Sequence, residues 1–558
     1  MRNTERVRAA YTRIAEVDRP EIWITLRPEE DVAAEAAAVD PGLPLAGLLL
    51  AVKDNIDVSG LPTTAACPAF AYEPAETAPA IARLVAAGAV VIGKTNLDQF
   101  ATGLVGTRSP YGAVRDAWRP DRVSGGSSSG SAVAVALGIA DVGIGTDTAG
   151  SGRVPAAFGG IVGVKPTRGV VPNLGAVPAC RTLDCITTLA RDLDTASRAA
   201  AVMAGPDHRD PTTRAWAANA PLAAPPRPLV GVPGADTLPG LTVAAARAFA
   251  VAADRLAAAG AEVVDLDATP FIEAGRLLYD GAFVAERHAA VGEFVDAHPV
   301  EVDPTVGAII SSAGRLAARD LVADGERLDR LRLQAQVQLA GLDAILLPTT
   351  TAQPTIAEVV ADPVGANARL GAFTNCANLL DLCAVAVPAG EADGGRFGVS
   401  VLAPAFADRV AAGVAALLLD AEAPGDGLGP TGVEVLVVGA HRSGQPLNHE
   451  LTSRGARLRG VAWTAPAYRL YALATAPPKP GLVRVAEDGV PIEGELWELP
   501  RTALGDFVAA LPAPMALGRA TLQDGREVVG FTCETAALDG APDISEHGSW
   551  PAYLRVVV

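Results

Sequence analysis

The sequence predicts an α/β protein with a second, smaller domain at its C-terminal end. Strand-like and helix-like segments alternate through residues 130–265, an order typical of a sheet covered by helices. A turn-rich stretch follows at 421–432, and beyond it the pattern changes to short strand-like segments. A chain of 558 residues is long enough for such a division. We therefore expect a first domain over residues 1–420, a linker over 421–432 and a second domain over 433–558.

Two helices with polar faces are predicted to open the first domain, and buried strands follow them. Short continuous apolar runs favour buried strands, whereas longer periodic runs favour helices. A glycine just beyond a periodic run is typical of a helix end, as at Gly88 and Gly260. On these grounds we expect helices at 4–18, 28–39, 77–87 and 243–259, and strands at 45–52, 230–233, 343–349 and from residue 89 onward.

A further helix is predicted over residues 271–293, and it contains Tyr279 and Arg287. These residues are eight positions apart, about two helical turns, so they are expected on one face of that helix. By pattern alone, a surface arginine and a half-buried tyrosine are the commoner outcome.

The second domain is predicted to be small and rich in strands. A loop at 439–444 follows its first strand and places His441 beside Arg442. Functional residues often lie on loops, so His441 is a candidate, although a surface loop histidine explains it equally well. The expected strands are 433–438, 468–473, 481–485 and 492–499, with a short helix at 504–510.

Composition and charge narrow the class of protein. The formal net charge of −18 argues against binding to nucleic acid or to an anionic membrane surface. The apolar run at 43–52 is too short to span a bilayer, and the charged N-terminal residues precede no apolar segment, so no signal peptide is expected. The six cysteines lack metal-ligand spacing, and we expect buried thiols in a cytoplasmic protein.

Two loops rich in glycine and serine are the strongest functional signal. Residues 124–131 are Ser-Gly-Gly-Ser-Ser-Ser-Gly-Ser, residues 145–153 are Gly-Thr-Asp-Thr-Ala-Gly-Ser-Gly-Arg, and a largely apolar segment separates them. Small residues let backbone amides approach a ligand closely. A flexible linker would not enclose an apolar segment, and a phosphate-binding P-loop would need a Gly-Lys-Ser/Thr ending that is absent here.

Lys53 comes directly after the apolar strand 45–52 and precedes Asp54 and Asn55. Most lysines are ordinary surface residues. A lysine that a buried strand delivers into a polar cluster can instead lose its water, and burial lowers its pKa from about 10.4 toward that of a neutral amine base.

These segments resemble the amidase signature family of serine hydrolases. The resemblance rests on residues 50–56, 125–128 and 145–151, and it extends over roughly residues 1–420. It implies a mixed central sheet covered by helices, the amidase signature fold. A histidine base is the less simple alternative, because none of the six histidines lies in the first 207 residues.

The resemblance implies a triad of Lys53, Ser127 and Ser151, in which the two serines are 24 positions apart and the Gly126–Ser127 peptide is cis. Neutral Lys53 would take a proton from Ser127, which relays it from Ser151, and Ser151 Oγ would attack an amide carbonyl. No metal or organic cofactor is required. Consecutive backbone N–H groups are expected to hold the oxyanion, those of Thr148, Ala149, Gly150 and Ser151.

Within that family the chain is similar to the allophanate hydrolases, in residues 145–155 and in its C-terminal extension. This implies a first domain that releases ammonia from allophanate and leaves N-carboxycarbamate. The second domain, similar to the gamma-glutamylcyclotransferase-like fold, would promote decarboxylation of that product in urea catabolism. Arg287 would then clamp the substrate carboxylate, with Tyr279 and Gly103 as further substrate contacts and His441 as a catalytic residue of the second domain.

Two alternatives stay open. The chain could be another amidase, acting on aryl or fatty amides or serving a transfer-RNA-dependent amidotransferase, although the second domain and the acidic balance argue against the latter. The second domain could instead be a binding or assembly module, which docks a urea carboxylase as pathway partner or joins two chains into a homodimer.

Overall fold

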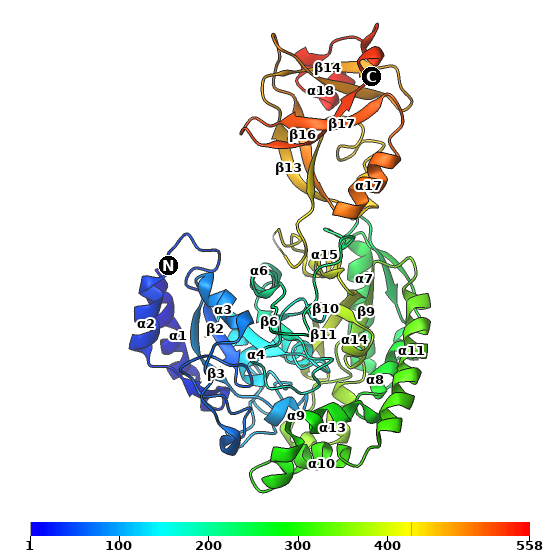
Figure 1. Ribbon diagram of the computed structural model, residues 1–558. Helices are drawn as coiled ribbons and strands as arrows, with labels where there is room; N and C mark the ends of the chain where they lie inside the picture. The colour runs from blue at the N-terminus through cyan, green and yellow to red at the C-terminus, as the bar shows by residue number, and fades with distance from the viewer. Residues whose placement is uncertain (1, 426, 558) are drawn as a thin grey trace. The chain divides into compact units, whose positions relative to one another are not determined.

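The computed structural model describes residues 2–425 and 427–557, which form two compact units (Figure 1). The first unit comprises residues 1–215 and 227–428, and the second comprises 216–226 and 429–558. Segment 216–226 joins the second unit through hydrogen bonds. The Leu222 N–H donates to the Gly455 carbonyl at 2.8 Å, and the Thr502 hydroxyl donates to the Ala218 carbonyl at 3.2 Å.

A mixed eleven-stranded sheet forms the centre of the first unit, and helices pack against it (Figure 1). The predicted α/β class and the mixed sheet covered by helices are confirmed. In sheet order the strands are β1 (Trp23–Leu26), β3 (Val90–Thr95), β2 (Leu49–Lys53), β4 (Val142–Thr146), β6 (Ile186–Ala190), β5 (Val162–Lys165), β10 (Leu382–Ala392), β11 (Gly395–Pro404), β9 (Ala344–Pro348), β7 (Leu229–Val232) and β8 (Glu262–Asp265).

The helices of this unit include those predicted from residues 4, 28, 77 and 243. Their bounds are α1 (Asn3–Val17), α2 (Glu29–Ala38), α3 (Pro79–Ala86), α4 (Ser129–Ala136), α5 (Arg153–Gly159), α6 (Leu193–Met203), α7 (Val243–Ala258), α8 (Thr269–Arg276), α9 (Ala285–Ala297), α10 (Pro304–Ala313), α11 (Ala318–Leu339), α12 (Ile356–Ala361), α13 (Gly365–Leu370), α14 (Cys376–Leu379) and α15 (Asp408–Leu419).

Strands β2 and β4 place Lys53 and the second glycine-rich loop at the same end of the sheet. β2 pairs in parallel with both neighbours, and Lys53 lies opposite Thr95. All three strands are buried along their whole length, which explains their continuous apolar sequences. Because the carboxyl ends of parallel strands meet at one edge, the residues that follow β2, β3 and β4 are brought together.

The single helix predicted over residues 271–293 is wrong. Helix α8 ends at Arg276, and α9 begins at Ala285 after a short 3₁₀ turn, so Tyr279 lies in the connection and only Arg287 is helical. Asp324, on α11, accepts the Ala282 N–H at 2.7 Å and stabilises this break. A β-carbon at Gly281 would lie 2.7 Å from the Asp324 carboxylate, so the close approach requires glycine there.

The second unit contains a five-stranded sheet and a separate hairpin. The expected strands near 433, 468, 481 and 492 are present, whereas β13, β17 and β18 were not predicted. β13 has no buried residue and therefore carries no apolar signal. The sheet order is β13 (Arg457–Trp463), β16 (Glu493–Leu499), β12 (Val433–Val437), β18 (Glu527–Cys533) and β17 (Met515–Thr521); β14 (Tyr468–Leu473) and β15 (Lys479–Arg484) form the hairpin, and the helices are α16 (His449–Thr452), α17 (Arg501–Ala509) and α18 (Trp550–Val557).

Candidate active site

Lys53 is fully buried at the end of β2, and its ammonium group contacts both serine loops. Its Nζ donates to Ser127 Oγ at 2.8 Å and to Thr146 Oγ1 at 2.6 Å. Burial lowers the pKa of Lys53 from 10.5 to about 7, while the negative charges of Asp98, Asp184 and Asp147 oppose the shift. A lysine with this pKa is partly a neutral amine near pH 7, as a general base requires.

The Gly126–Ser127 peptide is cis, as predicted. Gly126 lies against Asp98, where a β-carbon on it would be 2.0 Å from the carboxylate oxygen. The Asp98 carboxylate accepts the N–H groups of Gly106 and Arg108, each at 3.0 Å, and thereby holds the neighbouring loop. The Ser127 side chain is thus placed by a closely packed backbone.

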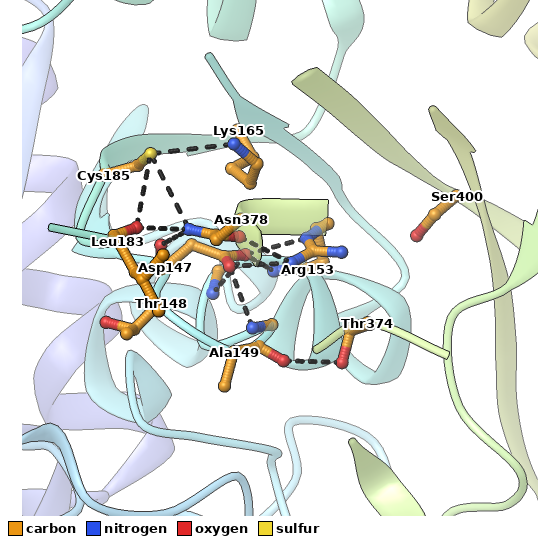
Figure 2. A network of polar contacts seen from close by, with 12 residues as sticks. Asp147, Thr148, Ala149, Arg153, Lys165, Leu183, Cys185, Thr374, Asn378 and Ser400 are labelled. Atoms are coloured by element: carbon orange, nitrogen blue, oxygen red, sulfur yellow. Dashed lines mark hydrogen bonds and ion pairs between the residues drawn. The ribbon is translucent and has the colours of Figure 1, made fainter. Parts of the chain in front are cut away.

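Ser151 lies in the turn before α5. Asp147 organises that turn, and Figure 2 shows it in contact with Arg153. The Asp147 carboxylate accepts the N–H groups of Gly150, Gly152 and Arg153, and the Arg153 guanidinium adds two contacts at 2.8 and 2.9 Å. Burial by itself would raise the pKa of Asp147, but the Arg153 charge outweighs it and the pKa is lowered. Asp147 therefore remains ionised and stabilises the backbone beside the predicted nucleophile.

One of the four predicted oxyanion donors already has an acceptor in the structure. The Gly150 N–H donates to Asp147 Oδ1 at 2.8 Å, so this donor is already used. Within residues 2–425 and 427–557, the N–H groups of Thr148, Ala149 and Ser151 have no acceptor. The Ala149 carbonyl is held by the Thr374 hydroxyl at 2.7 Å (Figure 2), which fixes the orientation of the following peptide.

The two serines are linked through backbone and not through their hydroxyl groups. The Ser128 N–H donates to the Ser151 carbonyl at 3.2 Å. In the part of the chain that the structure describes, the Ser127 and Ser151 hydroxyls form no hydrogen bond with each other. Catalytic hydrogen bonds are often looser without substrate. Proton relay between the two serines thus stays a prediction.

Arg287 and Tyr279 are in contact, although no common helix brings them together. Arg287 Nη2 donates to the Tyr279 hydroxyl at 2.9 Å, and Nη1 donates to Thr102 Oγ1 at 3.0 Å and to the Ala101 carbonyl at 3.3 Å. Arg287 is only 1% exposed, so it is not the surface arginine that pattern alone favours. Among the described residues it has no carboxylate within ion-pair distance, and its Nε has no partner.

The charge of Arg287 acts on the candidate active site. It contributes to the pKa shifts of Lys53 and of Asp184. The Asp184 carboxylate accepts the Thr148 hydroxyl and the N–H groups of Ala179 and Cys180, while burial raises its pKa. Asp184 therefore binds the segment that carries the predicted oxyanion donors, and it also feels the charge of Arg287.

Gly103 and His441 lie in different surroundings. A β-carbon at Gly103 would lie 2.6 Å from the Asp98 carboxyl carbon, so packing alone requires glycine there, and its contact with substrate stays a prediction. His441 belongs to the second unit and is only 5% exposed, so it is not a surface loop histidine. Its catalytic role also stays a prediction.

Thr146 and Asp98 are site residues that sequence reasoning missed. In the sequence Thr146 was considered only as part of the second glycine-rich loop. Its position at the end of an apolar segment, like that of Lys53, could have indicated that it lies beside Lys53. Asp98 follows β3, and the meeting of parallel strand ends would have placed it near Lys53. No group of His, Cys, Asp and Glu side chains suited to a metal ion occurs among the described residues.

Residues 5–410 match the amidase family, and residues 433–555 match the allophanate hydrolase C-terminal domain. The chain belongs to the amidase family.

Solved structures and curated relatives extend this match over the whole chain. The structure of Kluyveromyces lactis allophanate hydrolase is 36% identical with a TM-score of 0.90, and the match covers 100% of this chain and 97% of that one. Urea amidolyase of Saccharomyces cerevisiae is 38% identical over 98% of this chain and 32% of its own length. Urea amidolyase of Lachancea kluyveri is 39% identical over 95% and 31%. The chain therefore spans about a third of the length of these two curated relatives.

Other curated relatives match a smaller share of the chain. A glutamyl-tRNA(Gln) amidotransferase subunit of Thermus thermophilus is 35% identical over 72% of this chain and 90% of its own length. Through the described residues, no helix is both long and apolar enough to cross a membrane.

The pH dependence of this amidase-family site should follow Lys53. Below its pKa of about 7 the amine is protonated and cannot accept a proton, so kcat/KM for amide hydrolysis should rise with pH through about 7. Rates measured from pH 5 to 9 in constant ionic strength would show this limb. A flat profile, or one that falls through pH 7, would contradict the assignment of Lys53 as the base.

Proposed function

We propose that the first unit hydrolyses the terminal amide of allophanate and that the second promotes decarboxylation of the product. Two matches support this: the K. lactis allophanate hydrolase structure covers the full chain, and the second unit matches the allophanate hydrolase C-terminal domain. The family alone would leave the substrate open, because an amidotransferase subunit also matches 72% of this chain.

The choice of substrate rests on one observation: buried Arg287 has no carboxylate partner among the described residues. A guanidinium buried without a carboxylate partner is costly, because burial removes water that no opposite charge replaces. An anionic ligand removes that cost. Allophanate carries a carboxylate next to the urea group, and the fork of an arginine matches a carboxylate with two parallel hydrogen bonds. The Tyr279 hydroxyl, which Arg287 already contacts, would lie at the same end of the substrate.

The proposed first step is acyl transfer to Ser151. Ser127 takes the Ser151 proton as neutral Lys53 takes the proton of Ser127, and Ser151 Oγ adds to the terminal carbonyl. The N–H groups of Thr148, Ala149 and Ser151 are the proposed oxyanion donors. Ser127 then protonates the leaving nitrogen, which departs as ammonia. Water cleaves the ester and releases N-carboxycarbamate, so one water is consumed for each ammonia formed.

In the second step the bond between nitrogen and one carboxylate carbon breaks, and its electron pair stays on nitrogen. One proton is taken up there, and the products are carbon dioxide and carbamate. Carbamate then takes up a second proton and decomposes to ammonia and carbon dioxide. His441 is the proposed catalytic residue. Replacing His441 with Asn in the full chain should leave the first ammonia release intact and let N-carboxycarbamate accumulate, as measured by ¹³C NMR. Unchanged product decay would favour a binding or assembly role for the second unit.

Partners and compartment are part of the same proposal. Carboxylation of urea yields allophanate, so a urea carboxylase is the proposed pathway partner. All six cysteines are free thiols, which supports the reducing cytoplasm as the proposed compartment. A homodimer stays a prediction.

Substrate selectivity tests the function. We expect Arg287→Ala to lower kcat/KM for allophanate by about 10- to 150-fold, the equivalent of a charged hydrogen bond worth about 1.5–3 kcal/mol. Arg287→Lys should lose most of the same activity, since an ammonium cannot reproduce the fork. The neutral control is biuret, in which an amide replaces the carboxylate, and its slower hydrolysis should change much less. Ammonia release from both substrates measures the ratio.

An equal loss on allophanate and biuret would mean that Arg287 supports the structure and does not bind the carboxylate. Tyr279→Phe is the milder companion variant. It removes the hydroxyl that accepts from Arg287 Nη2, and we expect a loss of about 3- to 10-fold on allophanate.

A further inference from the structure

Lys479, at the start of β15 in the second unit, is a largely buried lysine whose ammonium has no protein partner among the described residues. It is only 7% exposed, and the described residues offer its ammonium no hydrogen bond and no ion pair. We propose that Lys479, the imidazole of His441 and the backbone N–H groups of Ala440 and His441 form a binding site for a small dicarboxylate. The choice of N-carboxycarbamate as its physiological ligand rests on the proposed function.

Backbone packing brings the two segments together. Pro480, the neighbour of Lys479, lies so close to Gly439 that a β-carbon on the glycine would be 2.2 Å from Pro480 Cδ. The start of β15 therefore lies against the start of the loop that carries Ala440 and His441. These residues all belong to the second unit.

Two aromatic rings and Glu450 hold the His441 side chain in place, and one of its ring nitrogens has no hydrogen-bond partner among the described residues. Its ring stacks on Phe531 at 4.8 Å between centroids and meets the edge of Phe507 at 5.3 Å. Nε2 is within hydrogen-bond distance of Glu450 Oε2, at 2.9 Å, whereas Nδ1 has no partner among the described residues. Burial lowers the pKa of His441, Glu450 opposes this, and the charge of Lys479 lowers it further, so the ammonium acts on the ring.

The charged side chains next to His441 in the loop and on β16 already have partners, whereas Lys479 has none among the described residues. Arg442 contacts Glu493 at 2.6 Å. Glu495 accepts the Ser443 N–H at 2.8 Å and the indole N–H of Trp497 at 3.0 Å. In the described part of the loop, the N–H groups of Ala440 and His441 have no acceptor.

An ammonium and two backbone N–H groups thus remain as donors without partners. Nδ1 of the neutral His441 ring, whose Nε2–H faces Glu450, is left as an acceptor. Such a set of donors beside a largely buried lysine suits an anion, because an anion supplies the missing acceptors and the opposite charge together. A small dicarboxylate can place one carboxylate on Lys479 and the other on the backbone N–H groups.

Titration calorimetry of the full chain with malonate tests the site. Malonate is stable and differs from N-carboxycarbamate only by a methylene in place of the N–H. We expect two malonate sites per chain, at Arg287 and at Lys479. Lys479→Met should remove one of them or weaken it by about tenfold or more, and Arg287→Met should remove the other. Arg484→Met, which removes an exposed charge from the same strand, should leave both.

Thermal unfolding separates binding from folding. Because Lys479 has no partner, replacing it with the similarly shaped Met should leave Tm unchanged or raise it, while malonate binding is lost. Two malonate sites of unchanged affinity in Lys479→Met would overturn the proposal, and so would a wild-type chain that binds malonate only at Arg287. Full hydrolysis of allophanate by Arg287→Met would contradict the role of Arg287 in substrate binding. Loss of one malonate site in Lys479→Met would still support the site in the second unit.

Discussion

Ser151→Ala is expected to reduce ammonia release from allophanate by about 10⁴-fold or more, the usual cost of removing the nucleophile of a serine hydrolase. The fold should not change, because the variant loses one hydroxyl while the network around Asp147 uses backbone N–H groups and Arg153. The remaining oxyanion donors would account for residual activity above that of water. A single-turnover assay with high enzyme concentration measures so large a loss.

The matched control is Ser129→Ala, a serine of the first glycine-rich loop whose hydroxyl donates to the Asn96 carbonyl at 3.3 Å. It should keep activity within about tenfold of the unmodified chain, since it loses one weak hydrogen bond. Substantial turnover by well-folded Ser151→Ala, with a Tm equal to that of the control, would refute Ser151 as the nucleophile.

Lys53→Met is expected to lower kcat/KM by about 10² to 10⁴-fold, the usual contribution of a general base. The methionine fills the same buried space but cannot take the proton of Ser127. The limb of the pH profile near 7 should disappear with the amine, because its pKa of about 7 sets that limb. The free energy of unfolding should stay the same or increase. Lys53 is fully buried, and none of the described residues gives it a carboxylate within ion-pair distance, so an apolar side chain suits its surroundings as well or better.

Lys94→Met, one strand away on β3, provides the contrast. Lys94 is also fully buried, but its Nζ lies 3.3 Å from Asp54 Oδ1, so its removal leaves a buried carboxylate unpaired. We expect it to destabilise the fold by about 3–5 kcal/mol. If Lys53→Met were the variant that unfolds and Lys94→Met the one that loses rate, the roles of the two lysines would have to be exchanged.

Much of the first unit was predictable, because its strands and helices carry strong local signals. β2 is a continuous apolar run, and α7 is a long periodic run with Gly260 beyond its end. The second unit was harder. Strand β13 is exposed along most of its length, so nothing in its sequence distinguishes it from a loop. Segment 216–226 carries no sequence signal that assigns it to either unit, and its hydrogen bonds to Gly455 and Thr502 associate it with the second.

By itself, the sequence determined the family, the α/β class and the candidate triad, because the glycine-serine loops and Lys53 lie in short segments whose order and spacing are local properties. Tertiary structure alone decided which groups are free to act. Asp147 uses the Gly150 N–H, Asp324 breaks the predicted helix between Tyr279 and Arg287, and Lys479 is left without a partner. Each of these depends on which side chain folding brings within hydrogen-bond distance, and long-range packing sets that distance.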